Sequence, residues 1–267
     1  MAVSHIRKSL GLSERKSCQL VNISVSEYRY QPKKDNDDAL RYRLRELAGQ
    51  RKRFGSPRLH IMLRRENMVI NHKRTERLYQ EEGLALRRKR RRKGAAGIRV
   101  MIKPAIRPNE HWSMDFVSDS IVTGRRFRAL AVIDNYTREC PVIEVDTSLG
   151  GSRVVNILER LAETRGLPEV ITIDNGPEFA GKALDEWAYR KGVKLNFIRP
   201  GKPIENAYAE SFNGRLRDEC LNTNWFLNLK HARDVIEEWR RDYNEVRPHS
   251  SLNNLTPMEY ANTTTGF

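Results

Sequence analysis

Three acidic residues stand out because of the segments that carry them. Asp115 interrupts an apolar segment, residues 112–117, that is predicted as a β-strand, and aspartate is disfavoured inside strands. Asp174 directly follows the short apolar segment Val170–Ile173, and open α/β sheets place ligands beyond the ends of such strands. Glu210 lies on a predicted helix. Side chains from two strands and one helix can converge at one edge of a sheet.

Each acid taken alone has an ordinary explanation. Asp115 could bond to nearby backbone at a strand end, Asp174 could shape an Asp-Asn-Gly turn, and Glu210 could be a solvated helical side chain. Together they form a different pattern, because clustered carboxylates are the hard oxygen ligands that Mg²⁺ and Mn²⁺ prefer. Two such ions can activate a hydroxyl group and stabilise the leaving oxygen of a phosphodiester. No set of histidines and cysteines has the spacing of a zinc site, so zinc is not expected.

The helix that carries Glu210 is predicted to have two different faces. One stripe is polar and could face a cleft: Asn206, Glu210, Asn213 and Arg217. The adjacent face is apolar: Ala209, Phe212, Leu216 and Cys220. The helix can therefore pack by the apolar face while it presents Glu210 on the polar stripe.

The chain has 267 residues and a net charge of +15, which favours a polyanionic partner. Residues 1–100 carry 27 Lys and Arg against 10 Asp and Glu, whereas residues 101–267 carry 22 against 24. The densest part of this excess is a run of seven consecutive cations: Arg87, Arg88, Lys89, Arg90, Arg91, Arg92 and Lys93. Such a run repels itself into an extended arm. The arm is either a solvated linker or, as its seven cations favour, a tether that follows DNA phosphates.

Composition and cysteine usage exclude several classes of protein. No apolar run approaches the roughly 20 residues that a membrane-spanning helix needs. The N-terminal segment also lacks the apolar region of a secretory signal. Cys18, Cys140 and Cys220 are far apart and odd in number, which favours buried thiols in a reducing compartment over a disulfide framework. A cytoplasmic protein is therefore expected.

Helical modules are predicted to precede an α/β core. Residues 1–30 have the outline of a helix-turn-helix, with a capping-box pattern at residues 24–27. A plain helical hairpin is the alternative that these residues favour on their own. Residues 37–86 predict three short helices, the second with Ser56 as its cap, and form a second helix-turn-helix-like module that suits DNA. A basic linker, a catalytic core and a C-terminal helical segment are expected to follow: residues 87–103, 104–225 and 226–267.

The core is predicted to be a mixed five-stranded sheet covered by helices. Strands are expected at residues 112–122, 127–133, 140–145, 170–173 and 193–198. The short gaps between the first three predict an antiparallel meander. Helices are expected at residues 152–165, 182–191, 206–221 and 231–244. The fold class expected is therefore α/β.

The spacing of the three acids and the short sequence motifs around them resemble those of one known family. Asp115, Asp174 and Glu210 are separated by 58 and 35 residues, and Arg217 follows Glu210 by seven. This pattern resembles the DDE signature of the OrfB-type insertion-sequence transposases, whose catalytic core is similar to that of retroviral integrases. The matching motifs are residues 112–116, 174–179, 200–203, 210–214 and 243–252, with 72–74 and 78–84 upstream. The resemblance covers nearly the whole chain.

The resemblance implies an RNase H-like core in which Asp115, Asp174 and Glu210 hold two Mg²⁺ or Mn²⁺ ions. It implies 3′-end cleavage at the element's ends, followed by attack of the freed 3′-OH on a second phosphodiester. Asn175 and Gly176 would shape the turn that presents Asp174. Besides the basic run, contacts with DNA would come from five residues: Arg217, Lys202, Asn213, Lys73 and Arg74.

The same resemblance implies partners. Element ends and target DNA would be bound by a multimer in the bacterial cytoplasm, in contact with the nucleoid and not with a membrane. The product of the family's first reading frame, OrfA, is expected as a separate or fused partner, because its helix-turn-helix and zipper are not expected in this chain.

Two other functions are open. An inactive or regulatory DNA-binding relic, or a repressor, of the element would use the basic first third equally well. Such a relic would tend to lose a metal ligand, and all three acids are present with their flanking motifs. A different RNase H-like nuclease, such as a resolvase, would need neither the motif at residues 243–252 nor the basic module. A transposase is therefore favoured.

Overall fold

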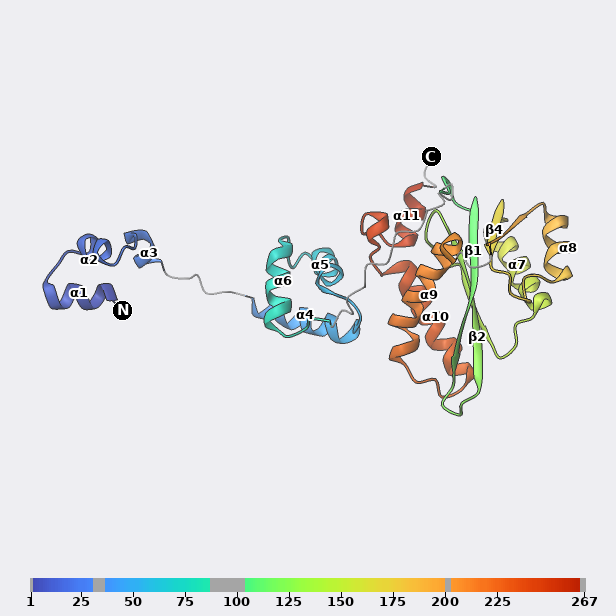
Figure 1. Cartoon of the computed structure of the whole chain (residues 1–267), viewed down its shortest axis with the longest axis horizontal. Helices are drawn as coiled ribbons and strands as arrows, with labels where there is room; N and C mark the ends of the chain where they lie inside the picture. Colours follow the sequence, from blue (N-terminus) through green and yellow to red (C-terminus); the bar gives the residue numbers. More distant parts are fainter. Residues whose placement is uncertain (1, 31–36, 87–103, 200–202, 265–267) are drawn as a thin grey trace. The chain divides into compact units, whose positions relative to one another are not determined.

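The computed structural model describes residues 2–30, 37–86, 104–199 and 203–264. By its internal contacts the chain divides into two compact units, residues 1–43 and 44–267, whose elements are drawn in Figure 1. Within the described ranges, no helix is long and apolar enough to cross a membrane.

The first unit begins with three short helices: α1 (Ala2–Leu10), α2 (Glu14–Leu20) and α3 (Val25–Arg29). The two predicted helices are α2 and α3. Ser24 caps α3 by accepting a hydrogen bond from the Glu27 N–H at 3.0 Å, and Asn22, with φ of 55°, lies in the turn between them. α1 is not among the predicted helices, although Val3, Ile6 and Leu10 recur at helical spacing. Of these three residues, only Val3 is buried.

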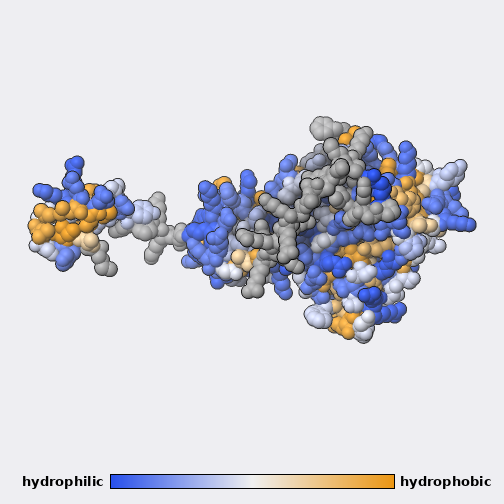
Figure 2. Space-filling model, in the orientation of Figure 1, coloured by the Kyte–Doolittle hydropathy of each residue, from blue (hydrophilic) through white to orange (hydrophobic). Residues whose placement is uncertain are grey.

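The three helices of this unit are linked by ion pairs and also expose apolar side chains. Glu14 accepts hydrogen bonds from Arg7 at 3.2 Å and from Arg29 at 2.7 Å, so one carboxylate links all three helices. Figure 2 shows apolar surface on this part of the chain, and its exposed large apolar residues include Leu10 and Leu20.

A second group of helices follows: α4 (Asp38–Gln50), α5 (Ser56–Arg65) and α6 (His72–Glu81). The three predicted helices are confirmed, but the predicted cap of α5 is wrong. Gly55 has the extended N-cap conformation, and Ser56 is already the first helical residue. Asn71 caps α6 by accepting a hydrogen bond from the Lys73 N–H at 3.0 Å. The helices are apolar on their inner sides, where the buried residues include Leu44, Leu47, Leu59, Leu63 and Leu78.

The sheet has five strands: β1 (His111–Ser120), β2 (Arg126–Asp134), β3 (Val142–Asp146), β4 (Val170–Ile173) and β5 (Lys194–Phe197). Their order is β3-β2-β1-β4-β5. The first three pair antiparallel, whereas β4 is parallel to β1 and to β5. The predicted meander and the predicted mixed sheet are therefore confirmed.

Helices cover both faces of this sheet (Figure 1). On one face lie α7 (Gly151–Arg165) and α8 (Lys182–Lys191); on the other lie α9 (Ala207–Glu219) and α10 (Leu229–Glu245). The chain then continues into α11 (Pro257–Thr264). The predicted start of α9 at Asn206 is one residue early, because residues 203–206 form a 3₁₀ turn that leads into the helix. Cys18, Cys140 and Cys220 are buried free thiols, as predicted.

Candidate active site

The two aspartates lie at the same edge of the sheet. β1 and β4 are parallel, with Trp112 opposite Ile171, and three further steps along this register bring Asp115 opposite Asp174. Side chains alternate between the faces of a strand. Trp112 packs with α7 and α8, whereas Val117 packs with α9 and α10. Asp115, two residues before Val117, therefore lies on the face that α9 covers.

Asp115 is half-buried and is held by two hydrogen bonds. Its Oδ1 accepts from the Phe116 N–H and its Oδ2 accepts from Asn213 Nδ2, both at 2.8 Å. Burial raises the pKa of Asp115, these two hydrogen bonds oppose the rise, and the charges of Asp174 and Glu210 add to it. The other two carboxylates are therefore near enough to repel Asp115. A bound cation relieves repulsion of this kind.

Asp174 opens the turn after β4. Its Oδ1 accepts a hydrogen bond from the Gly176 N–H at 3.0 Å, so Asp174 both shapes the turn and stands at the sheet edge. A Cβ at position 176 would lie 3.0 Å from this same oxygen, which is at the limit that real Cβ atoms tolerate. Asn175 supports the turn from its other side by donating a hydrogen bond to the Ile198 C=O at 2.7 Å. The turn thus has room for glycine only, unless the carboxylate shifts.

Glu210 is exposed on α9, and α9 packs against β1 and β2. The predicted apolar face is buried: Ala209, Phe212, Leu216 and Cys220. Asn206 anchors the start of α9, because its Nδ2 donates to the Met114 C=O at 3.1 Å beside Asp115. Within the described residues, the side-chain oxygens of Asn206 and Asn213 are buried and accept no hydrogen bond. The polar stripe therefore lies along the aspartates, with Glu210 at its outer side.

The three carboxylates suit a divalent ion in kind. They supply the hard oxygen ligands that Mg²⁺ and Mn²⁺ prefer. Across the part of the chain that the structure describes, no group of three or more His, Cys, Asp or Glu side chains is arranged to hold a metal ion.

Comparison with known protein families and relatives identifies the family to which this sequence and geometry belong. Residues 105–203 and 191–257 match models of the integrase core domain, and residues 35–92 match an HTH-like domain. The chain is 50% identical over 260 residues to a protein of insertion element IS407 from Burkholderia multivorans, covering 97% of this chain and 94% of the relative. It is 44% identical over 261 residues to a protein of insertion element IS476 from Xanthomonas euvesicatoria, covering 97% and 75%. It is 31% identical over 229 residues to the transposase InsK of IS150 from Escherichia coli, covering 80% and 79%. This chain belongs to the OrfB-type insertion-sequence transposases.

The family and the fold class expected from the sequence are thereby confirmed. The transposase has an integrase core with an RNase H-like mixed sheet, preceded by a helical HTH-like region. It is an enzyme of the polynucleotidyl transferase type.

The residues predicted to bind DNA lie in different situations. Arg217 is exposed on the polar stripe of α9, and Lys73 and Arg74 are exposed in the first turn of α6. Asn213 is engaged with Asp115 instead of pointing freely outward. Lys202 and the basic run at residues 87–93 lie outside the described residues, so their roles stay predictions.

The sequence motif at residues 243–252, to which the sequence assigns no role, is packed inside the transposase. Arg247 is only 4% exposed and forms a two-pronged ion pair with Glu219, with both N–O distances at 2.8 Å. Burial alone would raise the pKa of Glu219, but the Arg247 guanidinium outweighs it and holds that pKa below its usual range. His249 Nε2 donates to the Tyr243 C=O at 3.2 Å. The motif is therefore an internal support.

This support reaches α9, the helix that carries Glu210. The Tyr243 ring packs edge-on against Phe212 of α9 at 4.8 Å between ring centres, and against His249 at 4.6 Å. Phe212 is two residues beyond Glu210. No local pattern in the sequence could reveal this role, because the contacts join residues that lie far apart in the chain.

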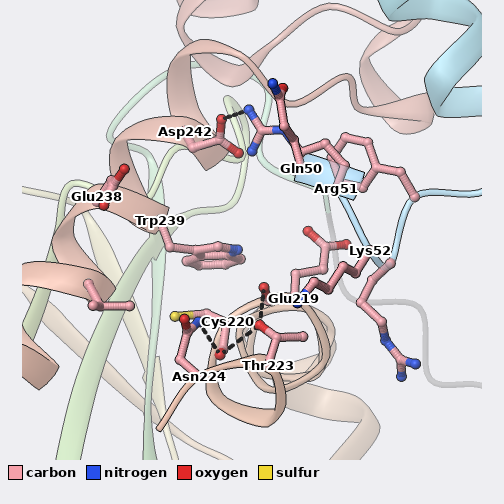
Figure 3. Close-up of a pocket in the computed structure, with 13 residues that line it drawn as sticks. Gln50, Arg51, Lys52, Glu219, Cys220, Thr223, Asn224, Glu238, Trp239 and Asp242 are labelled. Atoms are coloured by element: carbon pink, nitrogen blue, oxygen red, sulfur yellow. Dashed lines mark hydrogen bonds and ion pairs between the residues drawn. The ribbon is translucent and has the colours of Figure 1, made fainter. Parts of the chain in front are cut away.

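The turn between α4 and α5 also reaches the last turns of α9 and α10. Arg58 donates to Glu219 at 2.9 Å, and Arg51 pairs with Asp242 (Figure 3). Phe54 is buried, with the Arg58 guanidinium 5.0 Å from its ring centre. A polar cavity of about 430 Å³ lies between this turn and the two helices (Figure 3). The helical module is thus joined to the end of α9 by the Glu219 carboxylate, which Arg58 and Arg247 share.

Proposed function

We propose that this transposase cuts DNA at the ends of its insertion element and transfers the freed 3′-OH to target DNA. Two Mg²⁺ or Mn²⁺ ions would be held by Asp115, Asp174 and Glu210. The observation that carries the proposal is the register of β1 and β4, which brings half-buried Asp115 opposite Asp174 on the strand against which the Glu210 helix packs, in a chain with an integrase core. When bound, the ions would supply activation of the attacking hydroxyl group and stabilisation of the leaving oxygen.

The residues around the acids would orient them. The Phe116 N–H and the Asn213 amide each bond one oxygen of Asp115, and each oxygen keeps a second lone pair for a ligand. The Gly176 turn would keep Asp174 beside Asp115. Arg217, two helical turns beyond Glu210, would grip a phosphate of the strand to be cut.

DNA and protein partners complete the proposal. The α4–α6 module would bind element ends with Lys73 and Arg74, and the cations of residues 87–93 would follow neighbouring phosphates. A multimer would bring two ends together, and the OrfA product would add end recognition. The reaction would take place in the bacterial cytoplasm, at the nucleoid.

The test compares Asp115→Asn with Asp119→Asn on labelled duplexes that carry candidate element ends. Asp119 is a matched control, because it lies on the same strand and face and bonds the next backbone N–H at the same 2.8 Å. With Mg²⁺, Asp115→Asn should cut at least about 10²-fold more slowly, since loss of several kcal/mol of metal-assisted stabilisation implies that factor. Its affinity for DNA without Mg²⁺ should match that of the parent.

Two outcomes would count against the proposal. Equal cleavage by the parent and Asp115→Asn would refute the assignment of the acids. Binding of element ends by the parent without cleavage in Mg²⁺ or Mn²⁺, both alone and with the OrfA product, would favour a regulatory relic of the element.

A further inference from the structure

A second cleft follows a third side of α9. Tyr208, Ser211 and Arg215 line it from α9, and their spacing of three and four residues places them on one stripe. This stripe lies roughly 130° around the helix from Glu210. The cleft has a volume of about 1000 Å³ and is also lined by Arg138, from the loop after β2.

Positive charge predominates in this cleft. Five arginines line it, against two carboxylates and no lysine: Arg53, Arg58, Arg138, Arg215 and Arg247, with Asp218 and Glu219. Burial lowers the pKa of Arg58, and the charges of Arg247 and Arg215 lower it further, despite the neighbouring Glu219. The cleft therefore holds more guanidinium groups than carboxylates, and neighbouring arginines repel Arg58. We call this site the arginine cleft.

The arginines divide into a fixed floor and an available rim. Arg247 and Arg58 are both committed to Glu219, and Arg53 pairs with Asp218 at 3.2 Å. Arg215, in contrast, is exposed and forms no ion pair with any other described residue. Arg138 is half-buried, donates one hydrogen bond to the Asn135 C=O at 2.5 Å, and lies with its guanidinium 3.9 Å from the ring centre of Tyr208. The rim thus offers two guanidinium groups beside an aromatic ring.

The backbone of Arg138 is unusual in a way that suits this rim. Its φ is 64°, in the left-handed region that costs a non-glycine residue about 1 kcal/mol or more. Glycine or asparagine would fit this turn position with less strain. The chain nevertheless carries a long cation there, which the turn directs over Tyr208 and into the cleft.

We propose that the arginine cleft binds the phosphodiester backbone of one DNA strand alongside the strand that the active site cuts. This inference rests on the proposed function, because it concerns the same DNA. Guanidinium groups bind phosphates in a two-pronged geometry, and a tyrosine ring can stack on an unpaired base. The stretch from Tyr208 to Arg215 spans about 10 Å of helix, which matches about three phosphates of one strand.

The first test measures DNA binding without divalent ions, so that no cleavage takes place. Oligonucleotides, single-stranded and duplex, are titrated against the full chain over a range of salt concentrations. The double variant Arg138→Gln/Arg215→Gln should bind more weakly, and its log–log salt slope should fall by about 1.4 on single strands, at 0.7 per lost phosphate contact. The double variant Arg138→Lys/Arg215→Lys should keep most of the parent's slope, because both charges remain. Arg190→Gln, an exposed charge on α8 across the sheet, should leave the slope unchanged.

The second test locates the strand. All three native cysteines are buried, so a cysteine placed at exposed Ser211 would be the accessible thiol. With a duplex that carries activated disulfide tethers on its phosphates, the thiolate of Ser211→Cys should displace the leaving thiol and form a disulfide to one strand only. Ser152→Cys on α7, exposed on the opposite face of the sheet, should form none.

The outcomes separate this inference from the proposed function. An unchanged salt slope in a double variant that melts like the parent would overturn it, and so would cross-linking from Ser152→Cys equal to that from Ser211→Cys. If an acidic peptide such as polyglutamate binds the parent better than DNA does, and loses affinity in the double variant, the cleft is a protein-docking site instead. Because neither test needs cleavage, both can succeed or fail whatever the outcome of the Asp115→Asn experiment.

Discussion

Acid should weaken the transposase fold through His249. The His249 side chain is buried at 6% exposure. Burial and the positive charge of Arg247 lower its pKa to about 3, with smaller effects in the same direction from Arg58 and Arg215. The hydrogen bond to the Tyr243 C=O only partly opposes this shift. In an unfolded chain a histidine titrates near pH 6.5, so the folded protein must keep this ring neutral well into acid.

The sign and the size of the effect follow from these two pKa values. Between about pH 6.5 and pH 3 the unfolded chain binds a proton at His249 that the folded chain does not, so stability is fully present above this window and falls as the pH falls through it. At pH 5 the loss is about 2 kcal/mol, from about 1.5 pH units at 1.36 kcal/mol each. For a protein of this size that is about 4–8 °C in Tm.

The assay compares thermal melts of the parent and His249→Gln between pH 7.5 and pH 5. Glutamine does not titrate, and its amide can still donate to the Tyr243 C=O. At neutral pH the variant should be less stable, because it loses the ring contact with Tyr243 at 4.6 Å. On acidification to pH 5 it should lose about 2 kcal/mol less than the parent.

Other histidines set the background of this experiment. Burial also lowers the pKa of His60 and of His111, so the parent and the variant should share some acid sensitivity. The matched control is His5→Gln, because His5 is exposed on α1; it should melt with the pH dependence of the parent. Parallel curves for the parent and His249→Gln would refute the reasoning.

Three further perturbations probe the same structure. Gly176→Ala should slow Mg²⁺-dependent cleavage while leaving Tm within a few degrees, because the new Cβ displaces the nearby carboxylate; an unchanged cleavage rate would contradict this. Arg247→Met should destabilise the fold by about 3 kcal/mol in denaturant unfolding, at the low end for a broken buried pair because Arg58 still bonds Glu219. A midpoint equal to that of the parent would count against the pair. Replacing the cations of residues 87–93 by glutamine should weaken binding to all duplexes and lower the salt slope by about 0.9 per lost contact, whereas an unchanged slope would identify a simple linker.

Local patterns predicted the core well, because short-range physics determines where its elements begin and end. The bounds expected for β4 and α8 are those observed. β4 is a short apolar run between turn residues and α8 is followed by a glycine, so neighbouring residues determine where each element begins and ends. β1 ends at Ser120 instead of the expected 122, because the chain turns through Gly124 with φ of 81°. Asp115 and Asp174 were expected to meet at one edge of the sheet, and the register of β1 and β4 brings them opposite each other.

Tertiary pairing is what the sequence did not reveal. Arg58 and Glu219 are 161 residues apart, and Arg51 and Asp242 are 191 apart. Any of the chain's 49 cations could have paired with any of its 34 acids, so no sequence period selects these partners. The prediction that Ser56 caps α5 was wrong for a related reason. Ser56 has the chemistry of a cap, but backbone conformation decides the position, and the extended residue is Gly55.

Helix α9 shows why the net charge of a long segment is a weak guide to where DNA would bind. Residues 101–267 carry 22 cations and 24 acids, a balance that suggests a body without electrostatic attraction for DNA. Many of those acids are paired on other surfaces; Glu144, for example, accepts hydrogen bonds from Arg153 and Arg160 beside β3. Along α9, by contrast, Arg215 contributes to a surplus of guanidinium groups. Of the three faces described on α9, only the apolar face and the polar stripe follow from the sequence of the helix itself. The third becomes basic because α5 and the motif at residues 243–252 fold against it, so its charge is a property of the assembled structure.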